Sequence, residues 1–215
     1  MKKIFAIALV MCCAFSTASV MAAEPFFLAK VGAEAEYALK DAKGNVTSYV
    51  KTVVTEVNKK DDKNYTISFT SEVFDKNKKS IAKPVASTTE VVNGAIVNDP
   101  SATMQGAKVE GTFPSFPDEL SVGQVMEYSY TIKMGVSKTT VTGKNTVAAK
   151  ESVSTEAGSF DCYKVESEVN TKVMMQKSDI KTTSWYAKGV GAVKTETYDS
   201  KGKLETSMEL IAYKK

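Results

Sequence analysis

The stretch YSYTIKM, residues 128–134, decides the fold class. Its large side chains occupy every second position, and Ser, Thr and Lys fill the positions between them. Successive side chains of a β-strand point to opposite faces, so this alternation is typical of a half-buried antiparallel strand. The same period recurs in residues 65–69, 163–166 and 204–210, and no window after residue 23 has the apolar stripe and caps of a helix. The sequence therefore predicts an all-β protein.

Turn-forming residues separate the predicted strands. Asn93-Gly94 lies between two apolar runs and is the strongest two-residue hairpin signal in the chain. Residues 41–45, 75–79 and 199–203 each begin with Asp and contain Gly or Asn, which short hairpin loops favour. We expect antiparallel meanders that form a curved sheet, a half-barrel or a sandwich.

Two parts of the chain resemble each other. VGAEAEY at residues 31–37 and VGQVMEY at 122–128 share Val, Gly, Glu and Tyr at matching positions, and residues 65–73 parallel residues 163–169. Chance is the alternative, because Thr, Val and Lys are frequent throughout. We expect one all-β domain over residues 24–215, with repeat-like halves at about 27–99 and 117–215 that arose by internal duplication.

A crossover with two prolines, residues 100–116, links the halves. Long segments without alternation inside a compact domain are usually functional or disordered. This one carries Met104, Phe113 and Phe116, which a purely solvated linker would not need. It has two interpretations: a crossover strapped onto the sheet, or a flap over an apolar groove.

The N-terminus has the pattern of a cleavable secretory signal peptide, residues 1–23. Lys2 and Lys3 precede an apolar run, which ends in small residues up to Ala22 and Ala23. The apolar run is too short to span a bilayer as a helix. We expect an exported protein with no stable membrane insertion after cleavage.

Composition excludes several kinds of chemistry. The chain has no histidine and no arginine, so all 28 basic residues are lysines. Missing histidine removes the usual general base and the commonest zinc ligand, and missing arginine removes the bidentate clamp for phosphate. The net charge of +3, with acids and lysines interspersed, does not build the basic field that nucleic acid or an anionic membrane requires. We expect no enzymatic activity, no cofactor, no metal site and no nucleic-acid partner.

Cys162 is the one cysteine that remains after signal removal. A reactive thiol needs cationic surroundings that lower its pKa, and we expect instead a small buried hydrophobe. A hydrolase that uses two buried carboxylates stays as a further alternative, because the chain has 25 acids.

The most distinctive segment is WYAKGVGAVK, residues 185–194. Exposed Trp185 and Tyr186 would stack on a sugar or line a lipid groove. The alternative, which we expect, is that Trp185 fills the core and the two glycines form a bulge or a close strand crossing. The candidate ligand-binding residues are Trp185, Tyr186, Phe113, Phe116 and Met104.

Three segments together resemble a known family. They are FPDELSVGQ at residues 116–124, TEAGSFDCYKV at 155–165, and residues 185–210. They are similar to the TapB-like, domain-of-unknown-function family of exported bacterial β-proteins, over about residues 27–212. The resemblance implies a Gram-negative envelope location, periplasmic or secreted, and supplies no catalytic residues. Ala192 departs from the pattern, where a larger aliphatic residue is expected.

We therefore expect an exported, non-enzymatic protein that binds an apolar or amphipathic ligand on a concave sheet. Export, the missing catalytic residues and the apolar side chains of the crossover point to this function. The alternative is a structural or protein-interaction module whose partner is an envelope protein.

Overall fold

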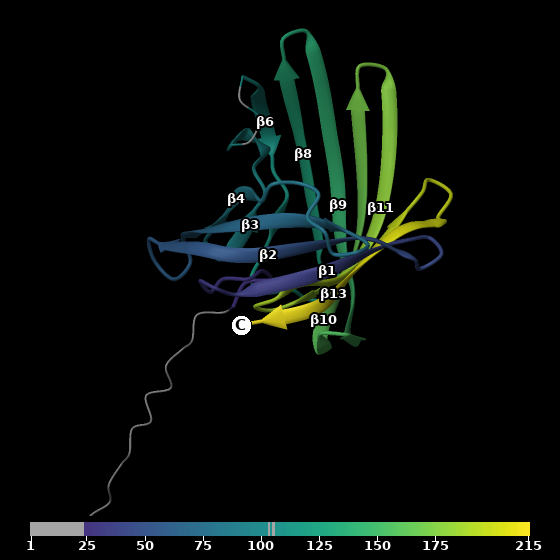
Figure 1. The fold of residues 1–215 in the computed structure, drawn as a ribbon. Helices are drawn as coiled ribbons and strands as arrows, with labels where there is room; N and C mark the ends of the chain where they lie inside the picture. Colours follow the sequence, from purple (N-terminus) through teal and green to yellow (C-terminus); the bar gives the residue numbers. More distant parts are fainter. Residues whose placement is uncertain (1–23, 103, 105) are drawn as a thin grey trace, which may run out of the picture.

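The computed structural model describes residues 24–215, with residues 103 and 105 left out. The predicted signal peptide, residues 1–23, lies outside the described residues. The prediction of an all-β protein is confirmed (Figure 1). Within the described chain, no helix is long and apolar enough to cross a membrane. Its elements are β1 (Glu34–Asp41), β2 (Val46–Lys59), β3 (Tyr65–Asp75), β4 (Val85–Val92), β5 (Ala95–Val97), the short 3-10 helix η1 (Pro100–Ala102), β6 (Lys108–Thr112), β7 (Ser115–Phe116), β8 (Val125–Met134), β9 (Ser137–Thr155), β10 (Gly158–Val173), β11 (Gln176–Ala187), β12 (Gly191–Tyr198) and β13 (Leu204–Lys214).

All thirteen of these strands lie in one open antiparallel sheet, in the order β6-β8-β9-β10-β11-β12-β13-β1-β2-β3-β4-β5-β7. Strands β1 to β5 form one meander and β8 to β13 form a second. The meanders join where β13 pairs with β1. Figure 1 shows that the long hairpins β8–β9 and β10–β11 run across the direction of β1, β2 and β3. Of the three predicted forms, the meanders therefore adopt the curved sheet.

The turns follow the predicted chemistry. Asn93 and Gly94 connect β4 to β5 with φ angles of 51° and 84°. A type I′ turn requires positive φ at both central positions, which Asn and Gly tolerate. Asp41, Asp75 and Asp199 each accept two backbone N–H bonds of their own loops at 2.8 or 2.9 Å. These carboxylates hold the loops closed.

The two meanders begin with the same turn. The Gly32 N–H donates to Val54 O at 2.9 Å, and the Gly123 N–H donates to Val147 O at 2.8 Å. In each case the valine N–H donates back to the residue that follows the glycine. Both valines are fully buried and stand beside a register shift of their strand. Duplication of one meander stays a proposal, and this recurrence supports it.

The crossover pairs with both ends of the sheet. Strand β6 pairs with β8 at one end, and β7 pairs with β5 at the other. Only Phe113 and Pro114 separate β6 from β7. The Asn98 N–H also donates to Pro114 O at 2.9 Å. The segment therefore straps the two ends of the sheet together, as the first of its two interpretations expects.

Gly111 allows the strap to lie against β8. It has a φ of 137°, and a Cβ at this position would stand 2.2 Å from Ser129 O and 2.6 Å from Tyr130 Cα. No side chain fits at such distances, and the backbone conformation itself favours glycine. Gly44 is a useful contrast, because its φ is 83° but a Cβ there would meet nothing within 4 Å.

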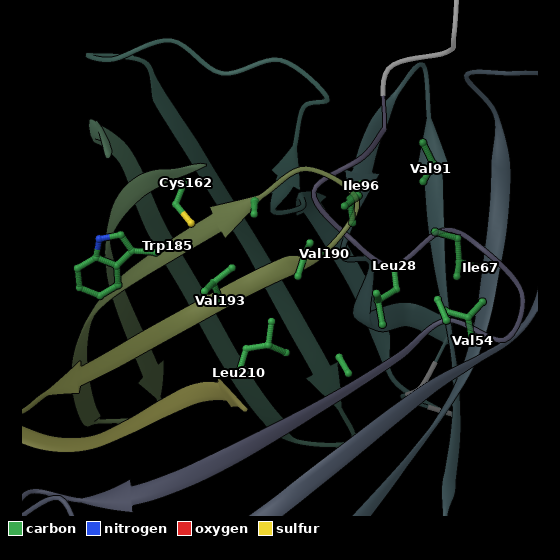
Figure 2. Close-up of a cluster of buried hydrophobic side chains, with 13 residues drawn as sticks. Leu28, Val54, Ile67, Val91, Ile96, Cys162, Trp185, Val190, Val193 and Leu210 are labelled. Carbon is green, nitrogen blue, oxygen red and sulfur yellow. The ribbon is translucent and has the colours of Figure 1, made fainter. Parts of the chain in front are cut away.

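Two apolar clusters form the core. The larger cluster joins both meanders, since it contains Val54 and Ile67 from the first and Val193 and Leu210 from the second (Figure 2). The smaller cluster packs Phe26 and Leu120 on Val147 and Val165 of β9 and β10. Burying one such aliphatic side chain contributes about 2 kcal/mol to folding. The halves therefore share one core.

Cys162 and Trp185 lie in the larger cluster (Figure 2). The Cys162 side chain is fully buried, and Trp185 is 8% exposed. A register shift falls between Trp185 and Tyr186, and Gly191 has a φ of 101°. The interpretation of Cys162 as a buried hydrophobe and of Trp185 as a core residue beside a bulge is confirmed.

The strap generates a first prediction. We expect Gly111→Ala to lower the free energy of unfolding by at least about 2 kcal/mol more than Gly44→Ala, because both substitutions strain a positive φ but only Gly111 lacks space. Urea unfolding measures the difference, and hydrogen exchange should show the loss of protection in β6. Equal effects of the two substitutions would show that the strap does not lie tightly against β8.

Candidate functional site

One face of the long hairpins is unusually apolar. In the strand register, Tyr128 lies opposite Gly143, which lies opposite Val169, which in turn lies opposite Ile180. Directly opposite residues share a face of the sheet. Val141 is buried, most of the others are half-buried, and Ile180 is 45% exposed. We call this surface the hairpin face; it consists of Tyr128, Tyr130, Ile132, Val141, Val169 and Ile180.

An aromatic row connects the hairpin face to the strap. The Tyr128 and Tyr130 rings stack with centroids 6.4 Å apart, and Phe113 packs on Tyr130 at 5.8 Å. The Tyr128 ring lies across β9 at Gly143, because atoms of the ring stand within 2.5 Å of where a Gly143 Cβ would be. Glycine on β9 thus leaves the space that the ring fills.

Beside this row lies a pocket of 270 Å³, which we call the crossover pocket. Tyr130, Pro100 and Pro114 give it an apolar wall, while threonine, asparagine and aspartate side chains supply polar groups. A few polar groups on an apolar wall are typical of small-molecule sites. An amphipathic molecule matches this lining. The pocket is lined by Thr88, Thr89, Val97, Asn98, Asp99, Pro100, Pro114 and Tyr130.

Burial raises the pKa of both tyrosines of the row. Desolvation raises the pKa of Tyr130 above the usual value for tyrosine. It also raises the pKa of Tyr128, with a smaller contribution from the neighbouring Tyr130. A neutral phenol offers one O–H donor and an acceptor oxygen. At neutral pH these groups can bind a ligand but cannot act as bases.

A larger groove of 440 Å³ lies on the other face of the same strands. Its side chains include Glu127, Lys144 and Glu168, which form one row across β8, β9 and β10. Removing such charges from water costs free energy, so an apolar ligand does not suit this groove. The crossover pocket fits the predicted ligand class better.

The structure divides the predicted ligand-binding residues. Phe113 belongs to the aromatic row, and Met104 is a half-buried residue of the crossover. Phe116 and Tyr186 meet at 4.5 Å, but they do so against the smaller core cluster. Trp185 lies in the larger cluster, and the five residues therefore do not form one site.

Trp185 has a structural set of contacts. Its indole N–H donates to Glu151 at 2.5 Å. The ammonium groups of Lys164 and Lys194 lie 5.7 and 5.1 Å from the centre of its ring. These lysines flank Trp185 on the neighbouring strands β10 and β12. The contacts anchor the indole and leave little of its face to a ligand.

Sequence reasoning missed Tyr128 and Tyr130 as site residues. The alternation of residues 128–134 placed both rings on one face, which was the available signal. Their role in a site depends on Phe113, which follows β6 directly in the chain. The pairing of β6 with β8 brings Phe113 against Tyr130, and the local sequence does not reveal this pairing.

Among residues 24–215, without 103 and 105, no group of three or more Cys, Asp or Glu side chains is placed to hold a metal ion.

Two solved structures share the fold. A candidate exported protein with a YmcC-like fold from Bacteroides fragilis has a TM-score of 0.67 at 18% identity, covering 89% of this chain and 100% of that one. A candidate lipoprotein from Parabacteroides distasonis has a TM-score of 0.68 at 21% identity, covering 89% of this chain and 99% of that one. At such identities the likeness establishes the fold alone.

A comparison with curated proteins gave no significant match. The model of one family, described as DUF3108-like, matches residues 30–210. This range contains the first meander, the strap, the crossover pocket and the second meander up to residue 210 of β13. The expectation of a domain-of-unknown-function family is thereby confirmed. The chain belongs to the DUF3108-like family.

Proposed function

We propose that the chain is an exported, non-enzymatic protein that binds an apolar or amphipathic ligand in the crossover pocket. The observation that carries the proposal is the aromatic row of Phe113, Tyr130 and Tyr128, which leads from the strap along the half-exposed hairpin face. Val169 and Ile180 continue this apolar face across β10 and β11, and Ile180 is 45% exposed. A ligand that covers this face accounts for its apolar character.

Pocket size narrows the ligand class. The volume of 270 Å³ is slightly below the range of about 300–1,000 Å³ that is usual for small-molecule sites. A slender chain or a small ring fits, with its remaining length along the hairpin face. The Asp99 carboxylate accepts the Ser101 N–H at 2.7 Å and so is held in place beside the pocket. A ligand with a neutral or cationic polar end matches this carboxylate.

Export is part of the proposal. It rests on the signal-peptide pattern of residues 1–23, and the two structural neighbours are themselves described as an exported protein and a lipoprotein candidate. Location in the periplasm or outside a Gram-negative cell, and the narrower TapB-like assignment, belong to the same proposal.

We propose that the protein is not an enzyme because its strongest nucleophile is unreactive. Without histidine, Cys162 is the strongest nucleophile that the described chain offers. Burial, with smaller contributions from the nearby Asp161 and Glu151 carboxylates, raises the pKa of its thiol to about 11. The thiol therefore stays protonated at neutral pH and is a poor nucleophile.

Cys162 can be tested by alkylation. We expect N-ethylmaleimide at neutral pH to modify Cys162 at least about 100-fold more slowly in the folded protein than in urea, because reaction requires opening of the core. Mass spectrometry follows the modification. A matched control is Ser200→Cys in a Cys162→Ala background, which places a thiol in an exposed loop and should react at once. Rapid modification of Cys162 in the native protein would contradict its burial and reopen a catalytic role.

Native mass spectrometry of the processed protein, purified from its own host, tests the ligand. We expect a bound small molecule in the wild type. Tyr130→Ala and Phe113→Ala should weaken its binding about tenfold each, because Tyr130 lines the pocket and Phe113 packs on the Tyr130 ring. Tyr49→Ala is the matched control, because Tyr49 is a half-buried aromatic residue of β2 outside the pocket and should keep the ligand.

Two outcomes would contradict the proposal. Wild-type protein without any bound molecule would favour the alternative of an envelope interaction module. Equal ligand loss in Tyr49→Ala and Tyr130→Ala would show that the ligand lies elsewhere.

A further inference from the structure

The tips of the two long hairpins lie side by side. Gly135 and Val136 turn β8 into β9, and Met174 and Met175 turn β10 into β11. The tips are connected through β9, because the Met174 N–H donates to Lys138 O at 3.4 Å. Figure 1 shows both hairpins projecting away from the first meander. The two turns therefore form one end of the molecule.

This end is strongly apolar and exposed. Val136 is 102% exposed, Met175 is 93% exposed and Met174 is 68% exposed, which makes them the most exposed large hydrophobic residues of the described chain. Scattered apolar side chains are common on protein surfaces, but a contiguous exposed group marks an interaction site. We call this surface the tip patch; it consists of Met134, Val136, Val173, Met174 and Met175.

Met174 is unfavourable in two ways: its backbone has a positive φ, and its apolar side chain is exposed to water. Both turns have two residues, and the first residue of each has positive φ: 57° for Gly135 and 54° for Met174. Glycine is the usual residue at such a position, as Gly135 in the β8–β9 turn illustrates. A methionine here gives up conformational free energy and exposes an apolar side chain. Neither loss helps folding, so the side chain points to a function.

Lysines surround the tip patch. Lys133, Lys138, Lys172 and Lys177 lie within three residues of a turn, and residues 129–142 and 171–178 contain no acid. Lys133 reaches Glu110 at 3.4 Å. The other three lysines form no ion pair within the described part of the chain. The fold thus gathers a local positive charge that the balanced composition of the whole chain does not show.

We infer that the tip patch docks on the surface of a lipid bilayer that contains anionic phospholipid headgroups. Methionine and valine side chains would enter the boundary between headgroups and acyl chains, and the lysine ammonium groups would contact the phosphates. The positive charge of the lysines complements anionic headgroups, and it therefore favours an anionic bilayer over an uncharged surface. The contact is peripheral, so it needs no membrane-spanning segment. It is independent of the crossover pocket and goes beyond the proposed ligand binding.

Vesicle flotation of the processed, signal-free protein tests this inference. We expect the wild type to float with phosphatidylcholine vesicles that contain about a third phosphatidylglycerol, and to bind pure phosphatidylcholine at least about tenfold more weakly. Added salt should reduce the binding, because it screens the lysines. In the double variant Met174→Gly/Met175→Ser, the bound fraction should fall about tenfold. Met174→Gly relieves the positive φ, so thermal unfolding should show undiminished stability.

Two further variants separate the contributions. Lys138→Glu/Lys172→Glu should abolish the preference for the anionic vesicles. Ile81→Ser/Val85→Ser is the matched control, because both residues are 61% exposed but lie away from the tips, and its binding should equal that of the wild type.

The inference is overturned if the wild type binds neither kind of vesicle, a result that would assign the tip patch to a protein partner. It is equally overturned if the Met174→Gly/Met175→Ser variant binds as well as the wild type. Both outcomes leave the crossover pocket untouched, since its residues are not changed.

Discussion

The two-residue connection between β6 and β7 constrains the whole sheet. These strands stand at opposite ends of a thirteen-stranded sheet, and only Phe113 and Pro114 separate them. In a flat sheet, strands about 4.8 Å apart would place the ends about 58 Å from each other. The connection itself spans about 11 Å at most. The sheet must therefore curl until its ends meet, and this curl lets both meanders bury side chains in one core.

The same constraint builds the candidate site. Because the strap meets β8 at Gly111, Phe113 arrives beside Tyr130, and Pro114 and Pro100 line the crossover pocket together with Tyr130. The long hairpins continue from this point to their tips, and β6 pairs only with the edge of β8, as far as Lys133. Their inner side chains stay half-exposed and their tips carry apolar residues. The same arrangement of strands thus brings the two ends of the sheet together at the strap and leaves the hairpin face and the tips exposed.

Much of the fold could be predicted from local pattern. The alternation of residues 128–134 identified β8, and Asn93-Gly94 identified the β4–β5 turn, because both signals depend on neighbouring residues. Strands β6 and β7 were missed because they are short and gain their form from distant partners. The site was only partly predictable for the same reason. Trp185 and Tyr186 are adjacent in sequence but lie in different clusters, and the lysines of the two tips converge only through the pairing of β9 with β10.

Double electron–electron resonance measures the distance between spin labels at Asn98→Cys and Ser129→Cys, in a Cys162→Ala background, and so tests directly whether the sheet curls. Asn98 bonds to Pro114, and Ser129 pairs with Thr112, so the two labels report on opposite ends of the sheet. The curled sheet predicts a single distance below about 30 Å, label linkers included. A distance near the roughly 48 Å that ten flat strand spacings give would contradict closure by the strap.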